Sequence, residues 1–272
     1  MPSGMCSRWP CAAIVAILLL TPARAAATIA PEAAAEILRK SDVASLAPAS
    51  FRARLRISAL PERSEPMEIE VWRSGDAKSL VRFLGSKEKG KYLLRLDDVV
   101  WFLGPLARKP LKISPARRLR GSASLDDVLG IRYGRDYEIE RAAEAEEAGE
   151  PLVVLDLTAR SKQALYPRVR YFVRRATERP VRVEHLLPSG KTSSIVEFLD
   201  WEEGDRPVAR RLVITDRLHS GVRTEVTLLE MEERVIPAGL FDLANPTERR
   251  RLEGADLMGG SSGRPAAPRP HV

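Results

Sequence analysis

The sequence predicts a mainly β protein, an antiparallel meander of strands curled into an open barrel. Three observations support this fold class. About a dozen short segments show the apolar alternation or the short apolar runs typical of strands. Turn residues such as Ser189-Gly190 and Gly204-Asp205 separate these segments. No strand–helix–strand alternation runs along the chain, which argues against a parallel sheet with helical crossovers.

Residues 1–26 have the layout of a secretory signal peptide. Arg8 supplies the positive charge, Cys11–Leu20 the apolar segment, and Thr21–Ala25 the small-residue cleavage site. The apolar segment is about ten residues long, well short of the roughly 20 that a membrane-spanning helix needs. We therefore expect export and cleavage of this segment, not a membrane anchor.

Both cysteines, Cys6 and Cys11, lie within this leader. The mature chain is therefore expected to contain no disulfide, no thiol nucleophile and no thiolate metal site. Neither cysteine follows the apolar segment, where a lipid-modified cysteine would lie. We thus expect no lipid anchor and no stable membrane insertion.

A helix is predicted to open the mature chain over residues 31–41 and to stop before Pro48. Pro31 is favourable in a first helical turn. Acidic Glu32 near the start, with Arg39 and Lys40 near the end, complements the helix dipole.

Strands follow, over residues 51–60, 67–71 and 80–103. Three arginines alternate with apolar side chains in the first of them, and glutamates occupy the next, so we expect cross-strand ion pairs on a solvated face. These residues are Arg52, Arg54, Arg56, Glu68 and Glu70. Ser124, with Asp127 three residues on, predicts a capped helix over 124–129 that ends at Gly130.

The second half of the chain again predicts strands, punctuated by turns. They are expected over Tyr137–Arg141, Leu152–Ala159, Val169–Arg174, Val181–Leu187, Ser194–Leu199, Val208–Asp216 and Val222–Met231. The acidic, alanine-rich segment Arg141–Glu150 has helix propensity, but its place between two strands favours a long hairpin.

The stretch from Leu80 to Val128 is the most informative part of the chain. It contains alternating strands, an Asp97-Asp98 turn, a Trp101-x-x-x-Pro105 hairpin exit, a basic proline-punctuated loop and the helix start Gly121-Ser-Ala-Ser-Leu-Asp-Asp127. Weaker signals are Glu178-Arg179-Pro180-Val181 and Ser189-Gly190-Lys191. In this order the features resemble the LolA-like outer membrane lipoprotein-sorting protein family, over most of residues 31–245.

The resemblance implies an incomplete, strongly curved barrel whose mouth is covered by a helix lid. It further implies a periplasmic carrier that shelters the acyl chains of a lipoprotein or another lipid. We expect this domain over residues 27–245, followed by a C-terminal extension over 246–272 that is disordered from about residue 259, where the composition is small, polar and proline-rich. An inner-membrane transporter and an outer-membrane acceptor are the partners that the resemblance implies.

The residues indicate no catalytic centre, no cofactor and no metal site, so we expect no enzyme. His185, His219 and His271 have no mutual spacing typical of metal ligands and are interpreted as surface or structural histidines. No hydrolase elbow, zinc-protease, phosphate-loop or dinucleotide motif occurs. Basic clusters at 108–120 and 249–251 lack interleaved aromatic residues, and export argues against nucleic acid.

Several strands are apolar on both faces, notably Val99–Leu103. A sheet with one face in water needs apolar residues at alternate positions only. Strands that are apolar at successive positions therefore indicate that the second face is covered as well. Either the two helices cover it and leave an ordinary core, or they form a loose lid over a cavity for acyl chains. The expected lining is Leu55, Ile57, Ile69, Val71, Val81, Phe83, Leu94, Trp101 and Leu103, and the expected lid residues are Leu125, Val128 and Leu129.

In carriers of this family an arginine helps to hold the lid closed. Arg52, Arg54 and Arg56 are candidates for this role, and no motif singles out one of them.

Two alternative functions stay open beside the carrier. One is a lipid-sensing envelope-stress regulator, since such regulators use the same fold, and the other is an accessory subunit of a lipid-exporting membrane transporter. Regulators of this kind carry a second folded domain, for which the residues after Asn245 are too few.

Overall fold

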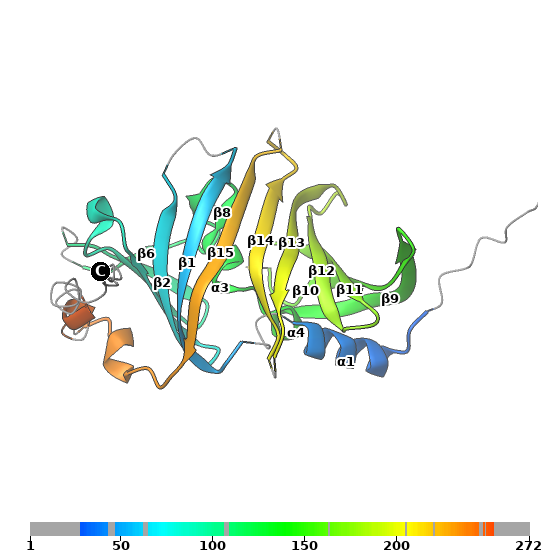
Figure 1. The fold of residues 1–272 in the computed structure, drawn as a ribbon, viewed down its shortest axis with the longest axis horizontal. Helices are drawn as coiled ribbons and strands as arrows, with labels where there is room; N and C mark the ends of the chain where they lie inside the picture. Colours follow the sequence, from blue (N-terminus) through cyan, green and yellow to red (C-terminus); the bar gives the residue numbers. More distant parts are fainter. Residues whose placement is uncertain are drawn as a thin grey trace, which may run out of the picture.

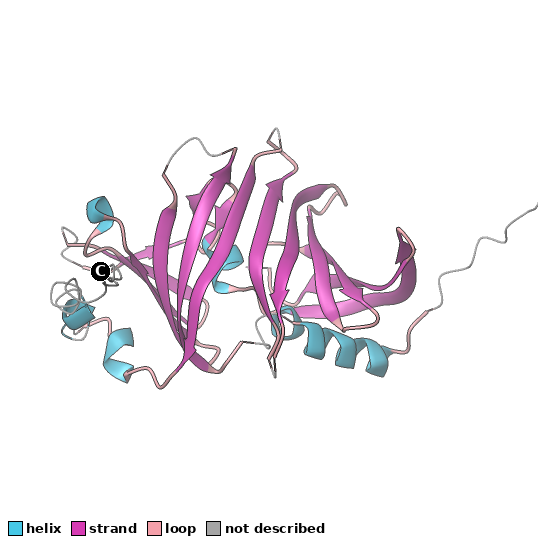
Figure 2. Cartoon of the chain, in the orientation of Figure 1, coloured by secondary structure: helices cyan, strands magenta, loops and turns pink. Residues whose placement is uncertain are grey.

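The computed structural model describes residues 28–42, 47–61, 65–105, 109–162, 164–204, 206–219, 221–244, 247 and 249–252. The predicted signal peptide and the predicted disordered tail lie outside these residues. The described chain is dominated by strands, with short helices placed at the ends and inside the curve of the sheet (Figures 1 and 2).

One antiparallel sheet of 13 strands forms the body of the molecule, in the order β6-β5-β4-β3-β2-β1-β15-β14-β13-β12-β11-β10-β9. The first half of the chain provides β1 (Ser50–Leu60), β2 (Met67–Ser74), β3 (Lys78–Phe83), β4 (Tyr92–Leu96), β5 (Val99–Leu103) and β6 (Leu111–Ile113). The second half provides β9 (Tyr137–Glu147), β10 (Glu150–Ala159), β11 (Arg168–Arg174), β12 (Arg179–Leu186), β13 (Thr192–Glu202), β14 (Val208–Asp216) and β15 (Arg223–Glu233).

Each strand pairs with its chain neighbour, except that β1 pairs with β15 and so joins the two halves. The outer strands β6 and β9 do not pair with each other, and the barrel stays open. The predicted antiparallel meander is confirmed. A second sheet of two short strands, β7 (Arg118–Arg120) and β8 (Ala123–Ser124), lies within the basic loop.

The helices are α1 (Pro31–Ser41), α3 (Leu125–Leu129) and α4 (Tyr133–Asp136), with 3-10 turns η1 (Ser86–Glu88) and η2 (Ala238–Phe241). The predicted bounds of the first two helices are confirmed. The segment Arg141–Glu150 forms the outer part of the β9–β10 hairpin, as its place between strands predicts.

The period of two in each strand separates an apolar concave face from an outer face. On β1, Arg54 and Arg56 point outward and both contact the Glu68 carboxylate of β2, at 2.6 and 2.8 Å. Arg52 likewise contacts Glu70. The predicted cross-strand pairs are therefore present.

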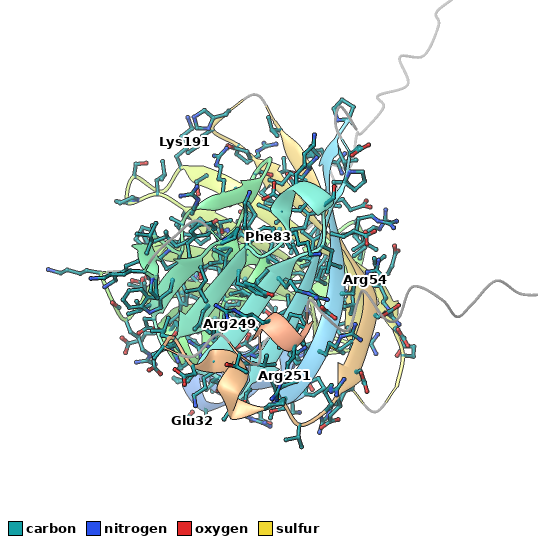
Figure 3. All side chains as sticks on the ribbon, turned by 90° about the vertical axis from the view of Figure 1, so that its left-hand side faces the viewer. Glu32, Arg54, Phe83, Lys191, Arg249 and Arg251 are labelled. Carbon is teal, nitrogen blue, oxygen red and sulfur yellow. The ribbon has the colours of Figure 1, made fainter. Side chains whose placement is uncertain are left out.

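The outer face of β2–β5 is covered by the end of the described chain, residues 236–244 and 249–252. Figure 3 shows Arg249 and Arg251 at this segment, in front of the strands. The Tyr92 hydroxyl donates to the Arg249 carbonyl oxygen at 3.1 Å, and Arg82 donates to the Leu252 carbonyl oxygen at 2.9 Å. The same Arg82 contacts Glu70 at 2.6 Å, so a buried ion pair lies beneath this cover.

Candidate functional site

The concave face is mainly apolar, and both halves of the sheet contribute to it. Six of the predicted lining residues lie on it together: Leu55, Ile57, Ile69, Val71, Val81 and Phe83. The second half adds Leu155, Val169, Val183, Val196, Ile214 and Val226. The alternation of each strand brings these side chains to one side.

Leu94, Trp101 and Leu103 do not lie on this face, and the expectation that they line the same cavity is wrong. Leu94 pairs with Trp101 across β4 and β5, and both point to the outer face. There they pack with Ile236, Leu240 and Phe241. Strands β4 and β5 are apolar on both faces because each face packs in a separate cluster. The cluster on the outer face is covered by the chain's own C-terminal segment.

Helix α3 lies inside the curve of the sheet, behind β14 and β15 in the view of Figure 1. Leu125 is fully buried against the concave face, and the other two predicted lid residues, Val128 and Leu129, are half-buried against it. The Ser124 hydroxyl accepts from the Asp127 backbone N–H at 3.1 Å, and the Asp127 carboxylate accepts from the Ser124 N–H at 2.9 Å. The predicted capping of this helix is confirmed as a reciprocal capping box.

An arginine holds α3 to the sheet, but it is none of the three candidates on β1. Arg95 of β4 forms an ion pair with Asp126 in the first turn of α3. Burial lowers the pKa of Arg95 to about 10, and nearby Arg132 adds to this effect. The sequence contains a signal for this role. Arg95 lies two residues after Leu93 in β4, so its side chain points to the same inward, apolar face as that of Leu93.

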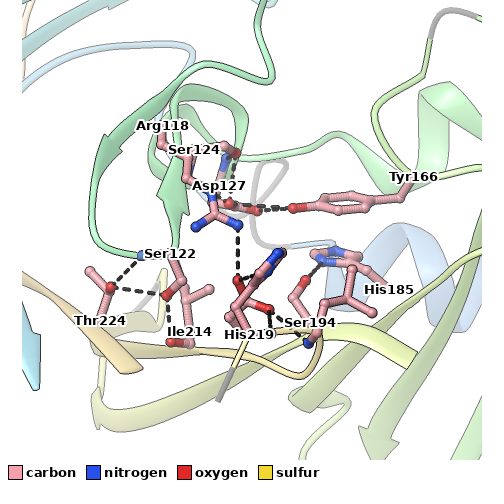
Figure 4. A network of polar contacts seen from close by, with 12 residues as sticks. Arg118, Ser122, Ser124, Asp127, Tyr166, His185, Ser194, Ile214, His219 and Thr224 are labelled. Carbon is pink, nitrogen blue, oxygen red and sulfur yellow. Dashed lines mark hydrogen bonds and ion pairs between the residues drawn. The ribbon is translucent and has the colours of Figure 1, made fainter. Parts of the chain in front are cut away.

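A buried polar cluster extends from α3 to the second half of the sheet (Figure 4). The Tyr166 hydroxyl donates to the Asp127 carboxylate at 3.2 Å. Two further contacts join His185 to Tyr133 at 3.0 Å and to Ser194 at 2.9 Å. His185 is fully buried, and burial lowers its pKa to about 3. The imidazole is therefore neutral, and one ring nitrogen can donate while the other accepts.

Helix α1 is attached to the same end of the concave face. The Tyr171 hydroxyl donates to the Ser41 carbonyl oxygen at 2.7 Å. The Asp42 carboxylate accepts from the Gly134 backbone N–H at 2.9 Å, which ties α1 to α4. All three helices are thus fixed to the sheet or to one another by a few buried polar contacts.

The predicted structural role of His185 is confirmed, and the structure places it inside the fold. It shares the inward register of Val183, and this parity is the sequence signal for its burial. The contacts of His185 run from a serine to a tyrosine, with no carboxylate on the ring. The geometry suits positioning of the helices, and we assign it no catalytic step. Within the described ranges, no three His, Cys, Asp or Glu side chains gather as a metal site would require.

Surface grooves lie elsewhere. One of about 580 Å³ lies between α1, α4 and β9, and none of the nine predicted lining residues borders it. In the part of the chain that the structure describes, no helix has the length and apolarity to cross a membrane.

The open antiparallel barrel with a short helix on its concave face is a LolA-like fold. A LolA superfamily protein from Nitrosomonas europaea is 22% identical, with a TM-score of 0.68 over 79% of this chain and 98% of that chain. A putative outer membrane lipoprotein-sorting protein domain from Vibrio parahaemolyticus is 16% identical, with a TM-score of 0.63 over 78% and 95%. A DUF1329 family protein from Desulfovibrio piger is 15% identical, with a TM-score of 0.65 over 79% and 98%.

These likenesses confirm the predicted resemblance at the level of the fold. A family model with the description "Uncharacterized protein" matches residues 75–245, more than half of the chain, and the chain belongs to this family. A comparison with curated protein sequences gives no match.

Proposed function

We propose that the protein is a periplasmic carrier, exported through the signal peptide predicted at residues 1–26. It binds the acyl chains of a lipoprotein or another lipid against its concave face and carries them between membranes. Two observations support this proposal. The fold is shared with structures described as LolA superfamily and lipoprotein-sorting proteins, and the concave face is apolar across both halves of the sheet.

The observation that carries the proposal is the nature of the cover over that face. Helix α3 has five residues, and its contact with β4 includes a single charged pair between Arg95 and Asp126. Outward movement of α3 would take Leu125, Val128 and Leu129 away from the apolar cluster that also contains the six lining side chains.

The burial free energy of the three lid residues is similar to that of one acyl chain. Burying one leucine or valine side chain contributes about 1.5–3 kcal/mol, so three lid residues contribute less than about 9 kcal/mol even if fully buried. A 16-carbon chain offers roughly 10 kcal/mol or more at about 0.8 kcal/mol per methylene, before ordering costs. The exchange is close to balanced, as a carrier that must also release its cargo requires.

Release depends on a partner that competes for the cargo or stabilises the open position of α3, because tight binding alone would trap the lipid. We propose an inner-membrane transporter as the donor and an outer-membrane protein as the acceptor. In this arrangement the protein serves outer membrane biogenesis as a binding protein, without catalysis.

The test is uptake of a fluorescent 16-carbon fatty acid by the mature protein, together with mass spectrometry of lipid that co-purifies from a periplasm. Leu55→Glu and Phe83→Glu place a carboxylate on the concave face at half-buried positions, and each should reduce uptake at least about tenfold. Leu103→Glu is the matched control, because it is also half-buried but lies on the outer face.

Circular dichroism establishes that each variant is folded. Uptake that survives both concave-face changes, or that is lost in Leu103→Glu alone, would remove the concave face as the binding surface. If the wild-type protein neither retains lipid nor takes up the fatty acid, the proposal is wrong. The helices would then cover an ordinary hydrophobic core.

A further inference from the structure

The groove between α1, α4 and β9 carries more positive than negative charge. Its volume of about 580 Å³ falls in the range of small-molecule sites. Four arginines and two aspartates line it: Arg39, Arg132, Arg135, Arg160, Asp42 and Asp76. Both aspartates already have partners, since Asp42 accepts from the Gly134 N–H at 2.9 Å and Asp76 pairs with Arg73 at 3.0 Å.

Arg132 is a buried cation of this groove, and its ion pairs with described residues are long. Its side chain is 8% exposed, and it donates to the backbone carbonyl oxygen of Asp76. The described carboxylates near it, those of Asp98 and Asp136, both lie 3.9 Å away. Burial lowers the pKa of Arg132, and the neighbouring Arg135 lowers it further.

The other arginines of the groove differ from Arg132. Arg39 contacts Glu36 at 2.6 Å, and Arg135 contacts Asp136 at 2.6 Å and Asp98 at 3.0 Å. Arg160 is exposed, and no ion pair of its guanidinium occurs among the described residues. The two ion pairs of the buried Arg132 are long, at 3.9 Å, and Arg160 is exposed, so an anion in the groove would gain from both guanidinium groups.

The remaining wall of the groove is apolar. Pro31, Ala35 and Leu38 come from α1, while Tyr137 and Ile139 come from β9. A ligand that fits this groove combines an anionic head with an apolar tail. The fork of an arginine can present two parallel N–H donors to two oxygens of a phosphate, as it does to a carboxylate.

We propose that this groove binds an anionic amphiphile with one acyl chain, its phosphate at Arg132 and Arg160 and its tail along Ala35, Leu38 and Ile139. The groove shares no residue with α3 or with the six lining side chains on β1, β2 and β3, so its occupation does not require α3 to move. It therefore gives the protein a second lipid-binding position, reached through a phosphate headgroup instead of through acyl chains alone.

Titration calorimetry of the mature protein with lauroyl-lysophosphatidylglycerol, kept below its micelle concentration, tests this site. Ala35→Glu places a negative charge in the groove at an exposed helical position and should weaken binding at least about tenfold, the scale of one charged hydrogen bond. Ala33→Glu is the matched control on the same helix, because Ala33 borders a different groove, and it should leave binding unchanged. Arg132→Gln should weaken binding to a similar degree.

Two further ligands define the chemistry. Uncharged monolauroylglycerol should bind at least about tenfold more weakly than the phosphate lipid, and inorganic phosphate should also bind weakly because it lacks the tail. Equal binding of monolauroylglycerol would overturn the anion site, and equal binding of inorganic phosphate would overturn the amphiphile. Unchanged affinity in both Ala35→Glu and Arg132→Gln would place the ligand elsewhere.

The Leu55→Glu variant separates this site from the proposed carrier function. It should lose uptake of a fluorescent 16-carbon monoacylglycerol, which has no anionic head for the groove, and keep the titration with lauroyl-lysophosphatidylglycerol. Loss of the groove titration in Leu55→Glu, with Ala35→Glu unaffected, would assign all lipid binding to the concave face and overturn the second site.

Discussion

Tyr166 and His185 stack face to face, with ring centroids 3.6 Å apart and ring planes inclined by 5°. The Tyr166 hydroxyl reaches the Asp127 carboxylate of α3, and the His185 ring contacts Tyr133 of α4. The pair therefore connects two helices to the concave face of β12. His185 is fully buried and neutral in the folded protein. A proton added to its ring would place a charge in the buried contact between the two helices and β12.

The first prediction concerns pH. The pKa of His185 lies at about 3 in the folded protein and near 6.5 in the unfolded chain. The unfolded state thus binds a proton that the folded state does not, between these two values. The stabilisation is complete above pH 6.5 and is lost as the pH falls toward 3, by up to about 1.4 kcal/mol per pH unit. Denaturant unfolding at pH 7, 6 and 5 measures it.

His185→Gln provides the control for this prediction, because glutamine keeps a donor and an acceptor but does not titrate here. The difference in unfolding free energy between wild type and His185→Gln should narrow as the pH falls from 6.5 to 5. A difference that stays constant over this window would show that His185 does not titrate with unfolding.

The second prediction concerns the contact between α3 and β4. Asp126→Asn removes the carboxylate partner of Arg95, leaves the buried guanidinium without its charge pair, and should lower the unfolding free energy by about 1–3 kcal/mol. The same change should accelerate fatty-acid uptake, because α3 is held less firmly. Stopped-flow fluorescence measures the rate.

Asp156→Asn is the matched change, since it breaks an ion pair with Arg170 at 2.8 Å elsewhere on the sheet. It should alter neither stability by more than about 0.5 kcal/mol nor the uptake rate. Equal uptake rates in wild type and Asp126→Asn would show that α3 does not limit access.

The third prediction concerns the cover on the outer face. Phe241→Ala removes a buried ring by which the C-terminal segment packs on the outer face, and it should cost about 3–5 kcal/mol of unfolding free energy. Val235→Ala is the control, because that side chain is 89% exposed, and it should change stability by less than about 0.5 kcal/mol. A similar small effect in both variants would show that the segment contributes little packing.

The fourth prediction concerns the loop that leads into α3. Gly121 has a φ of 53°, and a Cβ atom there would collide with the Thr224 hydroxyl of β15. The Ser122 backbone N–H donates to that same hydroxyl at 2.9 Å, so the loop is docked closely on the sheet. Gly121→Ala should therefore destabilise the protein by about 1–3 kcal/mol more than backbone strain alone would.

Gly149→Ala isolates the backbone contribution, because Gly149 also has a positive φ, 81°, but nothing lies within 4 Å of its Cβ position. Thermal and denaturant unfolding of the two variants should differ clearly. Equal losses of stability would mean that the loop shifts to admit the methyl group.

Strand register was predictable wherever alternation is strict. The arginines of β1 opposite Glu68 and Glu70 follow from a period of two, as do the six residues that share the concave face. The bounds of α1 and the capping box of α3 were also predictable, because Pro31, Ser124 and Asp127 act on their own helix termini. These features depend on neighbours in the chain or on the adjacent strand.

The assignment of Leu94, Trp101 and Leu103 was not predictable in the same way. Where both faces of a strand are apolar, alternation gives no sign of which face is inside. Their cover comes from Ile236, Leu240 and Phe241, more than a hundred residues away in the chain, and that contact forms in the tertiary structure.

The sequence by itself determined an open antiparallel meander, a helix that begins at Pro31, a second helix capped by Ser124, and the apolar stripe of each alternating strand, because local propensity and the period of two suffice for these. Tertiary structure alone decided that Arg95 reaches Asp126, that His185 stacks on Tyr166, and that four arginines meet at one groove. All three contacts depend on the curvature of the strands and on the packing of distant segments. The spacing of residues along the chain encodes neither the curvature nor this packing.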